Sequence, residues 1–167
     1  MEIKFTIGSS PLGKLLVATS EKGLCRVSLR ASAAELQRAL HASFPGARIT
    51  RDDRGLAPLR SVILRQIAGR PAGHRVPLDL HGTDFQQSVW KELLRIPAGS
   101  TRSYGDVARA IGKPTATRAV AQACGANPVP VIVPCHRVIQ SDGGIGGFTG
   151  GLHIKRALLG AEGVEFS

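Results

Sequence analysis

The chain has 167 residues, of which 43% are hydrophobic and 4% aromatic, and it carries a formal net charge of +10. This length allows one domain or two small ones around an aliphatic core. The charge favours a polyanionic partner such as nucleic acid, although a basic surface kept for solubility is the alternative. Residues 1–81 hold 13 Lys/Arg against 6 Asp/Glu, and residues 82–167 hold 9 against 6. The basic excess is therefore larger in the first half.

The cysteine content indicates a reducing compartment. Cys25, Cys124 and Cys135 cannot all pair within one chain, and their spacing is not that of a zinc site. We therefore expect reduced thiols in a cytoplasmic protein. No apolar run approaches membrane-spanning length, and the first residues lack the apolar segment of a signal peptide. These patterns predict neither a metal site nor membrane association.

The strand and helix signals of residues 1–81 predict a small α/β layer. Three short strands, residues 3–7, 15–19 and 24–29, are separated by turn signals and predict an antiparallel meander. Ser32 can cap a helix over residues 33–41, and a second helix is predicted over 59–68, after a polar loop around residues 51–54. A last strand is predicted over 76–80. His74 and His81 flank it without other ligands in register, so they do not indicate a metal site.

From Thr83 onward the pattern becomes helical. Thr83 can cap a helix with one apolar face, on which Trp90 is expected to pack in the core. That face comprises Phe85, Val89, Trp90, Leu93 and Leu94. Two short helices follow, over residues 104–111 and 115–124, and predict a helix-turn-helix. Arg118 and Gln122 lie one turn apart on the second of these helices.

A β-branched run over residues 129–133 predicts a buried strand that leads to Cys135, His136 and Arg137. A thiol reacts as its thiolate, and a neighbouring imidazole with a nearby cation makes that thiolate available at neutral pH. Adjacent residues of a straight strand point to opposite faces, so Cys135 and His136 can act together only if the chain turns at Pro134. The glycine-rich stretch over 141–151 lacks the Gly-Lys-Ser/Thr of a phosphate loop and suits a loop that closes over a substrate.

Five motifs together resemble the O6-alkylguanine-DNA alkyltransferases, also called methylated-DNA–protein-cysteine methyltransferases. In chain order they are Arg102-Ser103-Tyr104, Arg118-Ala119-Val120, Gly125-Ala126-Asn127-Pro128, Pro134-Cys135-His136-Arg137-Val138 and Gly150-Gly151-Leu152. The resemblance implies an N-terminal α/β domain over residues 1–81, with a small antiparallel sheet and helices. It implies a mainly α, winged-helix-like domain over 82–167 that carries the helix-turn-helix and the active site.

The resemblance also implies the roles of individual residues. Cys135 would accept the alkyl group, and His136, held by Glu162, would take the thiol proton through a water. Asn127 would bridge the helix-turn-helix to the active-site segment. Further residues would contact DNA or the extruded base, with Arg118 filling the gap that the base leaves. They are Tyr104, Arg118, Gln122, Val138, Phe148, Thr149 and Lys155.

In this sequence Phe148 stands where many family members have Tyr, and Thr149 where many have Ser. The implied activity is irreversible, single-turnover alkyl transfer from O6-alkylguanine, and from O4-alkylthymine, in duplex DNA. Base flipping would expose the target atom. No cofactor or obligate protein partner is implied, and a monomer is expected.

Two other interpretations remain open. A cysteine hydrolase using Cys135 and His136 would require an oxyanion site and multiple turnover, and it leaves the helix-turn-helix unexplained. A DNA-binding regulator or damage sensor is the non-enzymatic alternative. Sensors of that kind lack the acceptor thiol, whereas Cys135 is present here.

Overall fold

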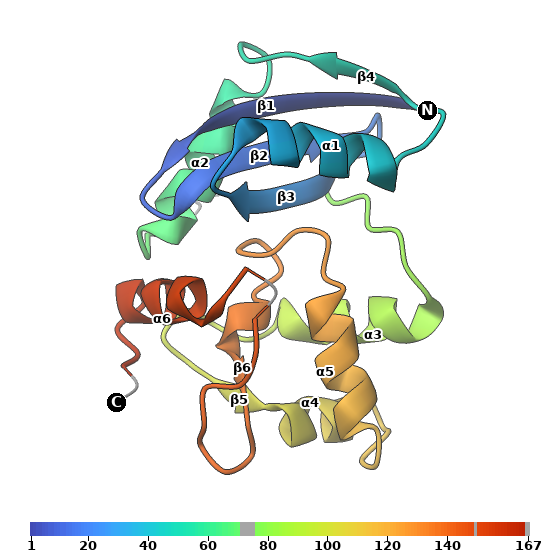
Figure 1. Cartoon of the computed structure of the whole chain (residues 1–167). Coiled ribbons are helices and arrows are strands. Elements are labelled where there is room, and N and C mark those ends of the chain that lie inside the picture. Colours follow the sequence, from blue (N-terminus) through green and yellow to red (C-terminus); the bar gives the residue numbers. More distant parts are fainter. Residues whose placement is uncertain (71–75, 149, 166–167) are drawn as a thin grey trace.

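The computed structural model describes residues 1–70, 76–148 and 150–165. The N-terminal sheet has four strands in the order β3-β2-β1-β4 (Figure 1). They are β1 (Glu2–Ser10), β2 (Gly13–Thr19), β3 (Leu24–Arg30) and β4 (Arg48–Arg51). The three predicted strands pair antiparallel, but β4 pairs parallel to β1, so the sheet is mixed. The sequence did not predict β4, because the strand has no alternating apolar pattern. Ile49 is its one side chain that packs against the small core of the sheet layer.

Helix α1 (Ala33–Ser43) packs on one face of this sheet. Its Leu36 and Leu40 join a small core with Phe5 and other strand residues. Helix α2 (Ala57–Ile67) begins with Pro58 in its first turn, two residues before the predicted start. Ile63 and Ile67 of α2 pack into a larger core that also takes in the C-terminal half.

The strand predicted over residues 76–80 is not formed. Leu78 makes a single bridge to Leu24, flanked by hydrogen bonds from Leu24 N to Pro77 O and from Asp79 N to Leu24 O, each 2.9 Å. Pro77 has no N–H to donate, which limits pairing to this one point. His81 lies beside Asp79, and His74 falls outside the described residues.

The C-terminal half begins with helix α3 (Asp84–Leu93), which Thr83 caps through a reciprocal pair of hydrogen bonds with Gln86. Trp90 is buried as predicted, and its Nε1 donates to the carbonyl of Ala123 at 2.8 Å. Leu94, expected on the buried face, is instead 46% exposed because it lies just past the end of the helix.

Helices α4 (Tyr104–Ala110) and α5 (Thr117–Gly125) form the predicted helix-turn-helix and pack against each other and α3 (Figure 1). Ser103 caps α4, and its preceding strand β5 (Arg102–Ser103) pairs parallel with β6 (Val138–Ile139). Helix α6 (Leu152–Ala161) follows the glycine-rich loop. None of the helices in the described ranges is long and apolar enough to cross a membrane.

The run over residues 129–133 is buried as predicted, but it is not a strand. Pro130 makes one bridge with Val133, and Val133 N donates to the carbonyl of Val129 at 3.0 Å, so the segment folds back on itself. Val131 has a φ of +78°, a conformation that β-branched residues rarely adopt. Pro130 in this run and Pro128 just before it have no N–H to donate, so the segment cannot complete a regular ladder.

One continuous core spans both halves of the chain. It joins Val17 and Val27 of the sheet to Trp90, Val133 and Leu158 of the C-terminal elements. The backbone adds a direct link, since Val27 N of β3 donates to the carbonyl of Pro128 at 2.9 Å. The division into domains 1–81 and 82–167 stays a prediction. The sheet layer nevertheless forms one wall of the region around Cys135.

Candidate functional site

Cys135 opens a single 3₁₀ turn, η1 (Cys135–Arg137), directly after Pro134. This turn is the bend that the sequence required between Cys135 and His136. Cys135 is 6% exposed. Burial raises the pKa of its thiol, while a hydrogen bond from Asn127 and the charge of Lys155 act in the opposite direction. The thiol of the resting protein is therefore protonated at neutral pH, and a base is needed to activate it.

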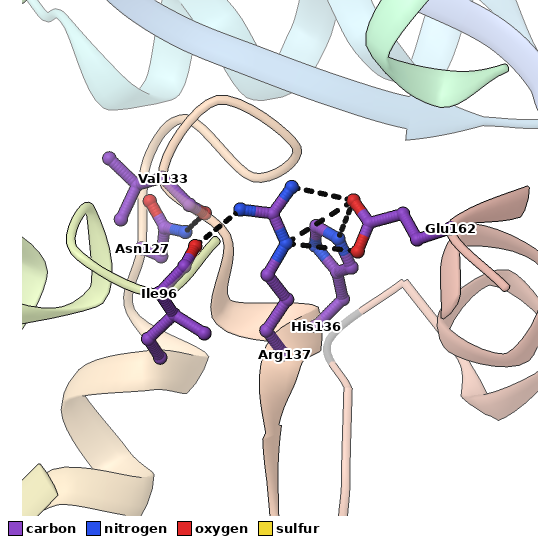
Figure 2. Close-up of polar contacts among 6 residues, drawn as sticks. All are labelled: Ile96, Asn127, Val133, His136, Arg137 and Glu162. Atoms are coloured by element: carbon purple, nitrogen blue, oxygen red, sulfur yellow. Dashed lines mark hydrogen bonds and ion pairs between the residues drawn. The ribbon is translucent and has the colours of Figure 1, made fainter. Parts of the chain in front are cut away.

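Glu162, just past the end of α6, binds the two residues that follow Cys135 (Figure 2). Its Oε2 lies 3.2 Å from His136 Nε2 and accepts from Arg137 Nη2 at 2.6 Å. Arg137 Nε donates to Oε1 at 2.9 Å, and Nη1 donates to the carbonyl of Ile96 at 2.7 Å. Burial raises the pKa of Glu162, but hydrogen bonds from His136 and Arg137, together with the charge of Arg137, outweigh it and lower the pKa to about 2. The carboxylate is ionised throughout the physiological range.

His136 is held in the form that can accept a proton. Burial lowers its pKa although Glu162 raises it, so the imidazole is neutral at pH 7. An ionised carboxylate only accepts hydrogen bonds, so Nε2 of His136 carries the proton and donates to Glu162. The lone pair is then on Nδ1, which is buried and has no hydrogen-bond partner among the described residues.

The cation that acts on the thiol is Lys155, not the neighbouring guanidinium that the sequence suggested. Arg137 is occupied by Glu162, whereas the charge of Lys155 lowers the pKa of Cys135. Lys155 is fully buried in α6, and its Nζ donates to the carbonyls of Val138 at 2.6 Å and Gly147 at 3.1 Å. Burial lowers the pKa of Lys155 to about 8, although the thiols of Cys135 and Cys124 raise it. The ammonium is therefore still charged at pH 7.

Tyr104, the first residue of α4, lies beside the same lysine. The Nζ of Lys155 is 5.8 Å from the centroid of the Tyr104 ring. Burial and the thiols of Cys124 and Cys135 raise the pKa of Tyr104 to about 12, so its hydroxyl remains a hydrogen-bond donor. Gly146 has a φ of +75°, and a Cβ there would lie 2.9 Å from the Tyr104 hydroxyl. Glycine at this position lets the loop approach the tyrosine closely.

Two cavities meet at Cys135. The first, here called the helix-side cavity, has a volume of about 400 Å³ and is lined by Tyr104, Ala121, Gln140 and Gly147. The second, the sheet-side cavity, has a volume of about 200 Å³ and is lined by β3, the end of α5 and Pro130. Cys135, Cys124, Gly125 and Phe148 line both. Cys135 thus borders both a space beside the helix-turn-helix and a space beside the sheet.

The remaining candidate residues occupy different environments. Arg118 and Gln122 are exposed on α5, away from the buried Val120. Asn127 bridges the end of α5 to the active-site segment, donating from Nδ2 to the carbonyl of Val133 at 2.8 Å and accepting from Val129 N at 3.0 Å. The carbonyl of Val138, expected to accept from a base, already accepts from Lys155. Thr149 lies outside the described residues.

Sequence reasoning missed two features of this site. It did not predict that Arg137 pairs with Glu162. A buried carboxylate beside a neutral histidine needs a positive counterion, and Arg137 supplies it. It also gave no role to β3, whose residues 26–30 line the sheet-side cavity. No local motif marks those residues, because their position depends on packing between distant segments. Among the described residues, no cluster of three or more His, Cys, Asp or Glu side chains could hold a metal ion.

A buried cysteine, followed directly by a histidine that a carboxylate binds, occurs here in a chain that also contains a helix-turn-helix. This combination indicates the class of proteins that pair a reactive cysteine with a nucleic-acid-binding motif. Residues 84–164 match the model of the 6-O-methylguanine DNA methyltransferase DNA-binding domain, and residues 3–80 match that of its ribonuclease-like domain. The inducible methylated-DNA–protein-cysteine methyltransferase of Bacillus subtilis is 42% identical over 147 residues, which cover 87% of this chain and 82% of the relative. The chain belongs to the 6-O-methylguanine DNA methyltransferase family.

Other relatives are longer or have solved structures. The regulatory protein Ada of Salmonella typhimurium is 40% identical over 162 residues, which cover 97% of this chain but 46% of Ada. The chain thus spans about half the length of that relative. The Mycobacterium tuberculosis O6-methylguanine methyltransferase superposes with a TM-score of 0.81 at 41% identity, over 96% of this chain and 92% of that one. A structure of M. tuberculosis OGT in complex with DNA gives a TM-score of 0.78 at 39% identity, over 97% and 92%.

Proposed function

We propose that this protein repairs DNA by transferring an alkyl group from O6 of guanine, and from O4 of thymine, to Sγ of Cys135. The observation that carries the proposal is that Cys135 lines the helix-side cavity and is followed directly by His136, which Glu162 binds. A buried, protonated thiol followed in the chain by a neutral histidine, whose Nδ1 has no partner among the described residues, is suited to proton removal and then nucleophilic attack.

In the proposed reaction, Nδ1 of His136 takes the thiol proton through a water, and Glu162 stabilises the imidazolium that forms. Sγ of Cys135 forms a bond to the alkyl carbon as the bond from that carbon to O6 breaks. The bonding electron pair stays with the guanine, which takes up a proton. The product is a thioether, which has no easy reversal, so each chain reacts once. Lys155 favours the reaction because its charge stabilises the thiolate.

The substrate is proposed to be a base extruded from duplex DNA, because O6 of a stacked guanine is not accessible to a buried thiol. The helix-side cavity would hold the base, with the Tyr104 hydroxyl as a donor and Phe148 as a wall. Arg118 and Gln122 lie on the exposed face of α5, where they could enter the groove, and Arg118 would fill the gap in the stack. The DNA-bound M. tuberculosis OGT supports this partner.

We further propose that the protein acts as a cytoplasmic monomer without an obligate protein partner. One chain supplies the thiol, the base, the carboxylate and the lining of both cavities. Cys25, Cys124 and Cys135 are all free and buried, which fits a reducing compartment.

The test is the intact mass of the protein after incubation with duplex DNA that contains one O6-methylguanine. We expect a gain of one methyl group, roughly fourteen daltons, on the peptide that carries Cys135, saturating at one per chain. Binding of the duplex without a mass gain would instead indicate a damage sensor. Continued loss of substrate without protein modification would indicate a hydrolase.

A further inference from the structure

Glu162 lies at the end of α6, where the helix itself gives the residue little support. Leu158 and Leu159 of α6 are buried, but the next two residues, Gly160 and Ala161, are exposed. Residues at a helix end open more readily than residues at its centre. The position of Glu162 therefore depends on what packs against the last turn of α6.

The hydrogen bond between Glu162 and His136 tolerates little displacement. Oε2 of Glu162 lies 3.2 Å from Nε2 of His136 (Figure 2), at the long end of the usual range for an N–H···O hydrogen bond. The Glu162 side chain is 4% exposed, so water cannot readily replace a lost contact. Burial and the charges of Arg137 and Lys155 lower the pKa of His136, whereas Glu162 raises it. A shift of Glu162 away from His136 would therefore weaken the base.

The end of α2 packs against the residue that precedes Glu162 (Figure 1). Gly69, which follows α2, has a φ of +77°, and a Cβ there would lie 2.1 Å from the carbonyl oxygen of Ala161 and 2.7 Å from its carbonyl carbon. The carbonyl of Ala161 thus occupies the space that a side chain would take. The two segments can approach this closely because residue 69 is glycine.

A second glycine turn contacts Glu162 itself. Gly99, which follows α3, has a φ of +85°, and a Cβ there would lie 3.3 Å from the carbonyl oxygen of Glu162. The same turn contains Ile96, whose carbonyl accepts from Nη1 of Arg137 at 2.7 Å (Figure 2). Residues 96–99 therefore contact both partners of the Arg137–Glu162 ion pair. The end of α6 lies against two glycine turns, one from each half of the chain.

The end of α2 is the firmer side of the contact with α6. Ile67 in its last turn is buried in the larger core, and Gly69 N donates to the carbonyl of Gln66 at 3.0 Å. A side chain at position 69 would have to open the contact with Ala161 by about 1 Å to reach an ordinary van der Waals separation. The exposed last turn of α6 would yield before the buried end of α2, and Glu162 would move with it.

We propose that Gly69 and Gly99 are positioning residues for alkyl transfer: the two turns fix the end of α6, so that Glu162 stays within hydrogen-bonding distance of His136. This inference rests on the proposed transfer to Cys135, in which His136 takes the thiol proton. Neither glycine contacts the reacting atoms. Through Gly69 the N-terminal half acts on the chemistry, although none of its described residues lines the helix-side cavity.

The test compares Gly69→Ala with Gly46→Ala. Gly46 has a φ of +79°, but a Cβ there would meet nothing within 4 Å, so the two variants share the backbone strain and differ in the contact. The assay is single-turnover methyl transfer at saturating duplex with one O6-methylguanine. We expect Gly69→Ala to slow transfer about tenfold or more without weakening duplex binding, and Gly46→Ala to leave both nearly unchanged.

A double-mutant cycle shows whether the effect passes through Glu162. In the Glu162→Gln background, adding Gly69→Ala should slow transfer by less than about twofold, because the contact that it disturbs is already lost. The proton NMR signal of His136 Nε2–H gives a readout that does not depend on activity. The hydrogen bond to the carboxylate shifts this signal downfield. It should move upfield in Gly69→Ala and stay in place in Gly46→Ala.

Thermal unfolding of each variant checks that it is folded at the assay temperature. If Gly69→Ala is not folded, Gly99→Ala decides the question, with a smaller slowing of about twofold to threefold. Transfer by the deciding variant as fast as by Gly46→Ala, or equal slowing with and without Glu162→Gln, would overturn the inference while methyl transfer by the unmodified protein still supported the proposed function. Absence of methyl transfer by the unmodified protein would overturn both.

Discussion

Replacing Glu162 by Gln tests the network behind the active-site turn. The pKa of Glu162 lies at about 2, against an ordinary value of 4.5, because its ionised form is bound by His136 and Arg137. At roughly 1.4 kcal/mol for each pH unit, this difference corresponds to about 3 kcal/mol of stabilisation at neutral pH. The amide keeps one acceptor for Arg137 but loses the charge. We therefore expect Glu162→Gln to lower the free energy of unfolding by about 2 to 3 kcal/mol.

The pH dependence has a defined sign. A carboxyl group with a depressed pKa stabilises the folded state fully above its unfolded pKa, and the contribution is lost as the pH falls toward the folded pKa. The difference between the unmodified protein and Glu162→Gln should therefore be constant from pH 7 down to about pH 5.5. At pH 3.5 it should be smaller by about 1 kcal/mol. Urea unfolding followed by fluorescence of Trp90 measures both quantities.

The matched control is Glu165→Gln, an exposed glutamate three residues further along the same segment. It should change the free energy of unfolding by less than about 0.5 kcal/mol. The reasoning is refuted if Glu162→Gln unfolds at the same urea concentration as the control, or if its destabilisation does not shrink on acidification.

Three further predictions concern reactivity. Cys135→Ser should abolish alkyl transfer and retain duplex binding in a gel-shift assay; residual transfer would show another acceptor. Arg118→Ala should slow repair of duplex DNA about tenfold or more while transfer from the free base is nearly unchanged, because only the duplex requires extrusion. Equal losses of rate for the duplex and the free base would contradict the proposal that Arg118 fills the gap left by the extruded base. Lys155→Met should raise the thiol pKa of Cys135, because the charge of Lys155 lowers it. The pH profile of iodoacetamide labelling measures this shift, with the exposed Arg156→Met as the control.

The local elements with strong signals were predictable from the sequence. Thr83 and Ser103, each followed three residues later by a polar partner, marked the starts of α3 and α4, and both caps are present. The apolar stripe placed Trp90 in the core. These signals are local, since a cap or a helical stripe depends on residues within one or two turns.

Other features depended on contacts between distant segments. The strand β4 forms by backbone pairing to β1, which leaves little trace in its side chains. Burial of residues 129–133 followed from their composition, but the fold of this segment depended on Pro128 and Pro130, which cannot complete a ladder.

For the site, the sequence by itself was enough to propose the reactive group. Cys135 followed by His136 predicts a nucleophile and a base, and the turn that this proposal requires is present directly after Pro134. Only the tertiary structure decided which charges act on them. It binds Arg137 to Glu162, buries Lys155 near the thiol, and sets β3 against the far side of Cys135. The pKa of a buried group depends on the charges and the solvent around it in space, and sequence separation does not measure either.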